Sequence, residues 1–194
     1  ARRADWRELE FLALDAEMSS LDPEEGELLS LGWVVVRDGA IALDSARHLV
    51  IRAANSVGQS ATIHQLRDCE VAEGIEAAEA LDQLLEAARS RVLVFHYAPL
   101  DLAYLDRLCT IHHGAPLLQP HLCTLQMEKR LLERRDHHLK KGDLTLGACR
   151  RRYHLPDYHG HNALWDALAT AELLVAQAAH RARGTRLTFN QLAG

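Results

Sequence analysis

The sequence predicts an α/β domain with a mixed β-sheet, in which an antiparallel three-strand meander is followed by parallel strands, flanked by helices. Two observations support this. Residues 9–51 contain three stretches with strand character, and their connections are too short for parallel crossovers. Beyond residue 74 the apolar residues recur at helical spacing, and helices alternate with short apolar strands.

Three strands are expected in the first part of the chain. Residues 9–17 predict a buried central strand, because its first half contains the apolar run Phe11-Leu12-Ala13-Leu14. Residues 28–37 include consecutive valines and predict a second strand. Asp38-Gly39 is a strong signal for a two-residue hairpin, so a third strand at 40–51 should pair antiparallel to the second.

Strands and helices alternate in the remainder. The pattern predicts a helix over 74–90, a buried strand over 91–95, a helix over 100–111 and a brief edge strand over 121–124. It then predicts helices at about 125–135, 144–153 and 163–183. We expect residues 1–184 to form a single domain and residues 185–194 to form a loosely held C-terminal tail.

The composition fits one globular domain. The chain has 194 residues, 48% of them hydrophobic and 25% charged. We find no run of 18 apolar residues that would span a membrane and no signal-peptide core at the charged start. The four cysteines are widely spaced and form no CxxC pair, which favours reduced thiols over a zinc site. We therefore expect a cytoplasmic protein without membrane contact.

Charge is unevenly distributed. The net charge of -5 argues against a protein that coats nucleic acid by charge alone. Residues 5–27 carry nine acidic residues and one basic residue, whereas residues 129–152 carry nine basic and three acidic residues. The first stretch can hold cations, and the second, with arginines at 150–152, can contact the phosphates of a nucleic acid. Ordinary solvated surface is the alternative for each stretch.

Three aspartates lie in apolar surroundings. Asp15 ends the first strand's apolar run, Asp101 is flanked by leucines, and Asp166 lies in the apolar stretch 163–168. A buried carboxylate costs several kcal/mol unless a cation compensates it. Side-chain alternation puts Glu17 on the strand face of Asp15, and Asp101 is near the carboxyl end of a strand, where α/β sheets place their sites.

Four carboxylates, those of Asp15, Glu17, Asp101 and Asp166, can therefore converge on one site. Carboxylate oxygens without a histidine or cysteine cluster suit Mg²⁺ or Mn²⁺. Two such ions can promote the hydrolysis of a phosphodiester.

His161 precedes Asp166 by five residues and follows Gly160, which interrupts the helical pattern. An imidazole with a pKa near 6.5 can take a proton from water near neutral pH, so His161 is a candidate general base. The alternative is that His161 is one of 12 histidines on a polar turn.

Three motifs in this order resemble those of the DnaQ-like 3′-to-5′ exonucleases of the DEDDh type, which are part of the RNase H-like superfamily. The resemblance covers about residues 10–176. The motifs are Asp15-Ala16-Glu17-Met18-Ser19-Ser20-Leu21, His96-Tyr97-Ala98-Pro99-Leu100-Asp101 and His161-Asn162-Ala163-Leu164-Trp165-Asp166-Ala167. Ile63-His64 also fits the family pattern.

The resemblance implies an RNase H-like fold and a role for each motif residue. Asp15, Glu17, Asp101 and Asp166 would bind two Mg²⁺ or Mn²⁺ ions, and His161 would be the general base. Leu21 would wedge against the terminal base, Met18 and Ser19 would approach the terminal sugar, and His96 would lie near the substrate phosphates or the terminal nucleotide. The substrate would be the 3′ end of a single strand or a frayed duplex, and the products nucleoside 5′-monophosphates.

Several positions depart from the family pattern. Met18 replaces Thr, Ser20 replaces Gly, Tyr97 replaces Asn, Leu100 replaces Phe and Gln65 replaces Gly. None of them is an implied metal ligand or the base, so they bear on substrate preference. Tyr97 has two alternatives, stacking on a base or packing beneath the site.

The sequence leaves two alternative functions open. One is an accessory domain that binds a DNA polymerase or a second copy of the chain, with catalysis secondary. The other is a phosphohydrolase for small nucleotides, which would need a closed pocket. Five intact catalytic positions argue against the first, and the basic stretch argues against the second.

Overall fold

The computed structural model describes residues 3–52, 73–136, 138–158 and 162–194. Five strands form one sheet in the order β3-β2-β1-β4-β5. β2 pairs antiparallel with both β1 and β3, whereas β4 pairs parallel with both β1 and β5. The predicted mixed sheet is therefore confirmed. The strands are β1 (Phe11–Met18), β2 (Leu28–Arg37), β3 (Ala40–Val50), β4 (Val92–Phe95) and β5 (His121–Cys123).

The turn between β2 and β3 confirms the predicted hairpin. Asp38 and Gly39 have φ values of 54° and 72°. Two consecutive residues in the left-handed region match the twist of the flanking strands. The antiparallel register of β1 and β2 then places Asp15 opposite Gly32 and Glu17 opposite Ser30.

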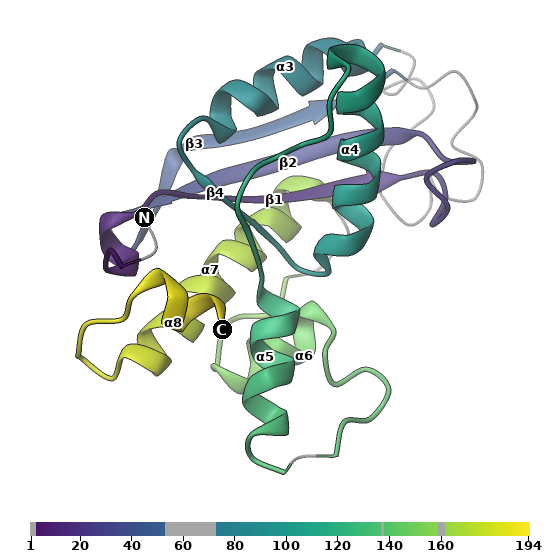
Figure 1. Ribbon diagram of the computed structural model, residues 1–194. Coiled ribbons are helices and arrows are strands. Elements are labelled where there is room, and N and C mark those ends of the chain that lie inside the picture. The colour runs from purple at the N-terminus through teal and green to yellow at the C-terminus, as the bar shows by residue number, and fades with distance from the viewer. Residues whose placement is uncertain (1–2, 53–72, 137, 159–161) are drawn as a thin grey trace.

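Helices cover the sheet on both faces, as Figure 1 shows. α3 (Ala77–Ala88) and α4 (Ala98–His113) cover one face, and α7 (Ala163–Ala182) covers the other. Alternate β1 residues pack accordingly: Leu12 and Leu14 lie in the core beneath α3 and α4, and Phe11 and Ala13 lie in the core beneath α7. The same alternation turns Asp15 and Glu17 toward α7.

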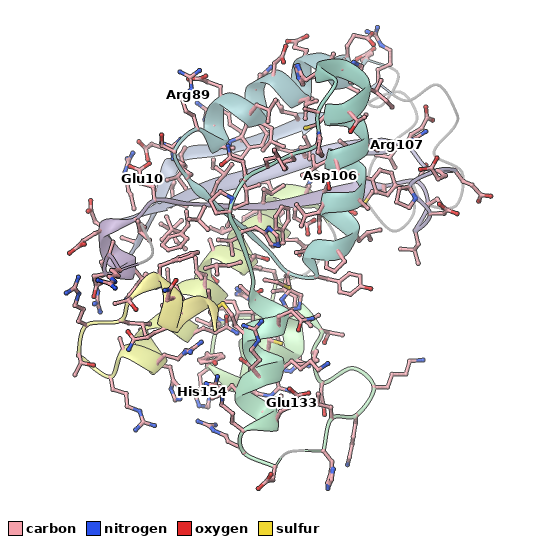
Figure 2. The ribbon with its side chains drawn as sticks, viewed as in Figure 1. Glu10, Arg89, Asp106, Arg107, Glu133 and His154 are labelled. Carbon is pink, nitrogen blue, oxygen red and sulfur yellow. The ribbon has the colours of Figure 1, made fainter. Side chains whose placement is uncertain are left out.

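Two shorter helices, α5 (Thr124–Glu133) and α6 (Leu146–Arg152), pack beside α7. Helix α4 begins at Ala98, two residues earlier than predicted, because proline is tolerated in a first helical turn. Asp106 lies on α4 and is labelled in Figure 2. Its carboxylate accepts a hydrogen bond of 2.9 Å from the Leu117 amide, which holds the segment that leads from α4 to β5. Within the described part, no helix is both long and apolar enough to cross a membrane.

Residues 185–194 are not the loosely held tail that the sequence predicts. They include α8 (Phe189–Ala193), and Leu187 and Leu192 are buried. The Trp6 amide donates to the Leu187 carbonyl at 2.9 Å, and the Asp5 carboxylate accepts from the Leu187 amide at 3.1 Å. These contacts join the two ends of the described chain, so residues 185–194 are an integral part of the packed domain.

Candidate active site

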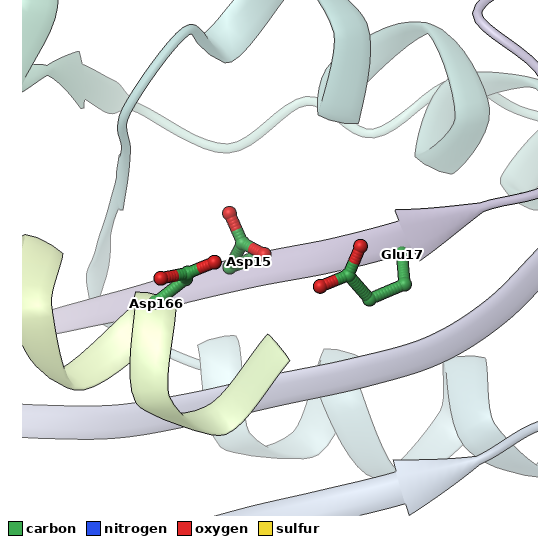
Figure 3. Close-up of side chains that lie close together, drawn as sticks. All are labelled: Asp15, Glu17 and Asp166. Atoms are coloured by element: carbon green, nitrogen blue, oxygen red, sulfur yellow. The ribbon is translucent and has the colours of Figure 1, made fainter. Parts of the chain in front are cut away.

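Carboxylates from β1 and α7 meet beside the sheet. Asp15 and Glu17 project from β1, and Asp166 lies in the first turn of α7. One oxygen from each of the three side chains lies within 4.8 Å of the other two. Figure 3 shows Asp15 between Asp166 and Glu17. The structure thus brings together three of the four predicted metal ligands within reach of one ion.

Asp101, the fourth predicted ligand, lies in the first turn of α4 and is buried. Its carboxylate accepts a hydrogen bond from the backbone amide of Ala16, the residue between Asp15 and Glu17. The described pairing of β1 with β4 ends at Ala13, so the strand edge beyond that residue is open to this contact. Asp101 and Asp166 both lie at helix N-termini, whose partial positive charge favours anions.

Burial and neighbouring carboxylates raise pKa values at this site. The pKa of Asp15 is raised well above its ordinary value, first by burial and then by the charges of Asp101, Asp166 and Glu17. Burial, with the charges of Asp166 and Asp101, raises the pKa of Glu17 to about 8. Burial also raises the pKa of Asp101 to about 7, although two backbone amides act in the opposite direction.

These residues fit a divalent cation. The donor set consists of carboxylate oxygens, the ligands that Mg²⁺ and Mn²⁺ prefer. The raised pKa values of Asp15 and Glu17 show that their anionic forms lack sufficient positive charge nearby. A divalent ion would supply that charge.

In EDTA we expect the stability difference between the wild type and a Glu17→Gln variant to change with pH. The folded-state pKa of Glu17, about 8, is above the ordinary value of 4.5, so folded Glu17 binds more protons than unfolded Glu17 between these pH values. Ionisation of Glu17 therefore does not lower the free energy of unfolding below pH 4.5, and it lowers that free energy increasingly as the pH rises to about 8. Across this pH window the melting temperature of Glu17→Gln should rise relative to that of the wild type. Added Mg²⁺ should strongly stabilise only the wild type. A constant difference would contradict the assigned environment.

Gly32 allows α7 to approach the sheet at the carboxylates. It lies opposite Asp15 on β2, and a Cβ atom there would come within 2.2 Å of the Ala163 carbonyl carbon and the Leu164 nitrogen. Sequence reasoning missed this residue, although an isolated glycine in a strand is a known sign of close backbone approach. Without a side chain at Gly32, the first turn of α7 can bring Asp166 to Asp15.

A Gly32→Ala variant is expected to displace α7, lower the free energy of unfolding by about 3 kcal/mol and reduce divalent-ion affinity, because backbone atoms cannot yield to the added methyl group. Chemical denaturation and calorimetric Mn²⁺ titration measure the two effects. Gly147→Ala is the matched control, since a methyl group added there would meet a flexible Arg151 side-chain atom at 3.4 Å. Equal behaviour of the two variants would refute the role of Gly32.

Tyr104 fixes the turn that follows β1. Its hydroxyl donates to the Ser20 and Asp22 carbonyls at 2.7 and 3.1 Å. A Cβ at Gly26 would lie only 1.9 Å from the same hydroxyl, so Gly26 is needed for this contact. Ser19 is exposed and accepts a 2.8 Å hydrogen bond from the Glu27 amide. This turn holds Leu21, which is 82% exposed.

The predicted substrate-binding residues differ in their placement. Leu21 lines an open pocket of about 300 Å³ together with Pro23, Tyr97, Pro99, Leu100 and Ala103. Tyr97 is exposed and has a φ of 81°, an uncommon value for an aromatic residue. The Met18 side chain is instead buried in the core beneath α3 and α4.

His96 is held by protein partners at both ring nitrogens. Nδ1 lies 2.8 Å from Thr124 Oγ1, and Nε2 lies 2.9 Å from the Leu144 carbonyl oxygen. Burial lowers the pKa of His96. The ring thus links the end of β4 to the segment that precedes α6.

His161, the predicted general base, lies outside the described residues, as do His64 and Gln65. The described chain resumes at Asn162, the N-cap of α7. Its side chain accepts a 3.0 Å hydrogen bond from the Leu164 amide.

Arg150 is not available to bind phosphates, contrary to the sequence-based hypothesis for residues 150–152. Its side chain is buried and donates to the Ala169 and Pro156 carbonyls and to Glu172 at 2.7–2.8 Å. Arg152 is likewise engaged, by Glu128 and the Asp143 carbonyl. Arg151 is exposed and 3.6 Å from Asp157, so it is the member of this group that can contact a ligand.

Arg150→Ala is expected to lower the free energy of unfolding by about 3–5 kcal/mol, because it leaves Glu172 and two carbonyls without their donor. Arg151→Ala should change it by less than about 0.5 kcal/mol, as an exposed ion pair contributes little. Urea denaturation of both variants tests this difference. Similar losses in both would contradict the structural role of Arg150.

The chain belongs to the exonuclease family (RNase_T), to which residues 12–174 match. It is thus an exonuclease-family domain with a DnaQ-like, RNase H-like fold, as the motifs predict. It is 26% identical over 166 residues to a PolC-type DNA polymerase III of Thermotoga petrophila, covering 85% of this chain but only 12% of that protein. It is 23% identical to DNA polymerase III subunit epsilon of Aquifex aeolicus, covering 85% of this chain and 78% of that one.

Solved structures show the same fold. Exonuclease I of Methylocaldum szegediense superposes with a TM-score of 0.74 at 14% identity, over 89% of this chain and 41% of that chain. Exonuclease X, solved in complex with 5′ overhanging duplex DNA, superposes with a TM-score of 0.68 at 22% identity, over 96% of this chain and 99% of that chain.

Proposed function

We propose that this chain is a 3′-to-5′ exonuclease of the DEDDh type that removes nucleoside 5′-monophosphates from the 3′ end of a single strand or frayed duplex. The observation that carries the proposal is the convergence of Asp15, Glu17 and Asp166, from two elements far apart in sequence, at oxygen separations within 4.8 Å. Membership of the exonuclease family supports it.

Asp15, Glu17, Asp101 and Asp166 would hold two Mg²⁺ or Mn²⁺ ions. When bound, such ions polarise the phosphodiester and offset the charge on the leaving oxygen. His161 would take a proton from the attacking water as the new oxygen–phosphorus bond forms. The bond from phosphorus to the 3′ oxygen of the preceding nucleotide breaks, and that oxygen gains a proton from solvent.

The remaining side chains would position the 3′ end. Leu21 would pack against the terminal base, and Ser19 with the Met18 backbone would face its sugar. His96 would act indirectly, because both ring nitrogens already have protein partners that hold the start of α6.

An association with a DNA polymerase is the second candidate function. The support is that two similar relatives are a PolC-type DNA polymerase III and a polymerase subunit epsilon. A homodimer is a further alternative for the partner. We also propose a cytoplasmic location, with which the free thiols of Cys109, Cys123 and Cys149 agree.

The proposal is tested with single-stranded DNA and RNA of equal length, labelled at either end and incubated with Mg²⁺, Mn²⁺ or EDTA. A 3′-to-5′ exonuclease shortens 5′-labelled strands stepwise and releases labelled mononucleotide from 3′-labelled strands. Stepwise loss from the 5′ end, or equal cleavage in EDTA, would refute it. The same assay establishes the preferred sugar.

A further inference from the structure

A cavity of about 300 Å³ adjoins the carboxylates on the α7 side. Its lining includes Asp166, so it borders the candidate metal site. Thr145 and Gly147 at the start of α6, with Tyr158, form other parts of its wall. The proposed function assigns no ligand to this cavity.

Tyr158, which lines this cavity, packs against Trp165. The rings of Tyr158 and Trp165 have centroids 5.6 Å apart and an angle of 46° between their planes. Trp165 directly precedes Asp166 on α7 and is 52% exposed, whereas the other two tryptophans, Trp6 and Trp33, are buried. A large exposed aromatic surface beside a reaction site is suited to stacking on a nucleobase.

Tyr158 is a rigid support for Trp165. Its hydroxyl donates to Glu172 at 2.7 Å, and the Arg150 guanidinium carbon lies 4.5 Å from the centre of its ring. The ion pair of buried Arg150 with half-buried Glu172 fixes both of these partners. The aromatic pair is therefore held in place before any ligand binds, which lowers the entropic cost of stacking.

The two pockets are formed by segments next to different carboxylates. The pocket at Leu21 and Tyr97 belongs to segments that directly follow Glu17 or precede Asp101, whereas the cavity at Tyr158 is bordered by Asp166. In Figure 3, Glu17 and Asp166 lie on opposite sides of Asp15. The terminal nucleotide of a bound strand can occupy the pocket at Leu21 and Tyr97 while its scissile phosphate lies at Asp15. The next nucleotide of that strand can then lie at the cavity beside Tyr158.

We propose that Trp165, supported by Tyr158, binds the base of the penultimate nucleotide, whose 3′ oxygen is the leaving group, by stacking. This inference rests on the proposed function. Stacking accepts every base, so the subsite would add affinity without sequence preference. The substrate would then be a chain of at least two nucleotides rather than a nucleoside monophosphate ester.

The test compares two oligonucleotides, one intact and one with an abasic residue at the penultimate position. For the wild type, KM should be roughly tenfold higher for the abasic substrate. Trp165→Leu should raise KM for the intact substrate by a similar factor and show no difference between the two substrates. Trp165→Phe should restore most of the difference. Leu118→Ala, which alters an exposed residue in the segment between α4 and β5, is the control and should behave as the wild type.

Trp165 also gives a binding signal that does not depend on turnover. Because Trp6 and Trp33 are buried, stacking should quench mainly the fluorescence of Trp165. We expect the intact oligonucleotide to quench the fluorescence of an Asp15→Asn variant and the abasic oligonucleotide not to quench it. The double variant Asp15→Asn, Trp165→Phe lacks the indole ring at position 165, so it should show no quenching with either oligonucleotide.

Equal KM values for both substrates in the wild type, or equal quenching by both, would overturn the subsite while leaving the exonuclease proposal intact. Failure of the wild type to cleave either strand would refute the exonuclease proposal, and the quenching would then decide the subsite alone.

Discussion

An Asp15→Asn variant is expected to lose metal-dependent cleavage and yet to melt at a higher temperature than the wild type in EDTA. Asn keeps the size of the side chain but removes a charge that burial and three neighbouring carboxylates disfavour. The free energy of unfolding should rise by about 1–3 kcal/mol. For a chain of this size that is a shift of roughly 2–12 °C in the melting temperature.

The loss of activity should be roughly a thousandfold or more, because the bound ions supply several kcal/mol of transition-state stabilisation and each 1.4 kcal/mol is a factor of ten. Cleavage of a 5′-labelled strand with Mg²⁺ measures it. Asp44→Asn, at an exposed aspartate on β3, is the control and should leave cleavage and stability near wild type. Retained cleavage by Asp15→Asn would remove Asp15 from the site.

A His161→Ala variant is expected to lose roughly 10² to 10⁴ in kcat while KM changes little, since a general base acts on the water and not on substrate affinity. We expect kcat of the wild type to decrease at acidic pH, because a protonated imidazole cannot act as a base, and we expect this decrease to disappear in His161→Ala.

The matched control is His154→Ala, which removes an exposed imidazole from the segment after α6 (Figure 2). It should retain the wild-type rate and pH profile. If His161→Ala kept wild-type turnover, the base would have to be another group. Equal losses in both variants would point to a general effect of histidine removal.

Local patterns were sufficient to predict much of the sheet and the carboxylate site. The apolar start of β1 and the Asp38-Gly39 turn predicted its strands, because hairpin geometry depends on the residues at the turn itself. Side-chain alternation along β1 predicted that Asp15 and Glu17 share a face, and the structure adds that this face is the one covered by α7.

Features that depend on contacts between distant segments were not predicted. The polar, glycine-containing end of the chain resembles a tail, but Leu187 and Leu192 pack into a core formed by other elements. Arg150 lies in a basic run that resembles solvated surface, and only the fold reveals that Glu172 and two carbonyls enclose it. The requirement for glycine at position 32 likewise becomes visible only when the α7 backbone packs against it.

The most direct measurement is the anomalous scattering from a crystal of the wild type grown with Mn²⁺ and a nucleoside 5′-monophosphate. We predict two anomalous peaks roughly 3.5–4 Å apart, within coordination distance of Asp15, Glu17, Asp101 and Asp166. Manganese bound elsewhere, or carboxylates that turn away from the ions, would contradict the proposal that these four residues form the catalytic centre.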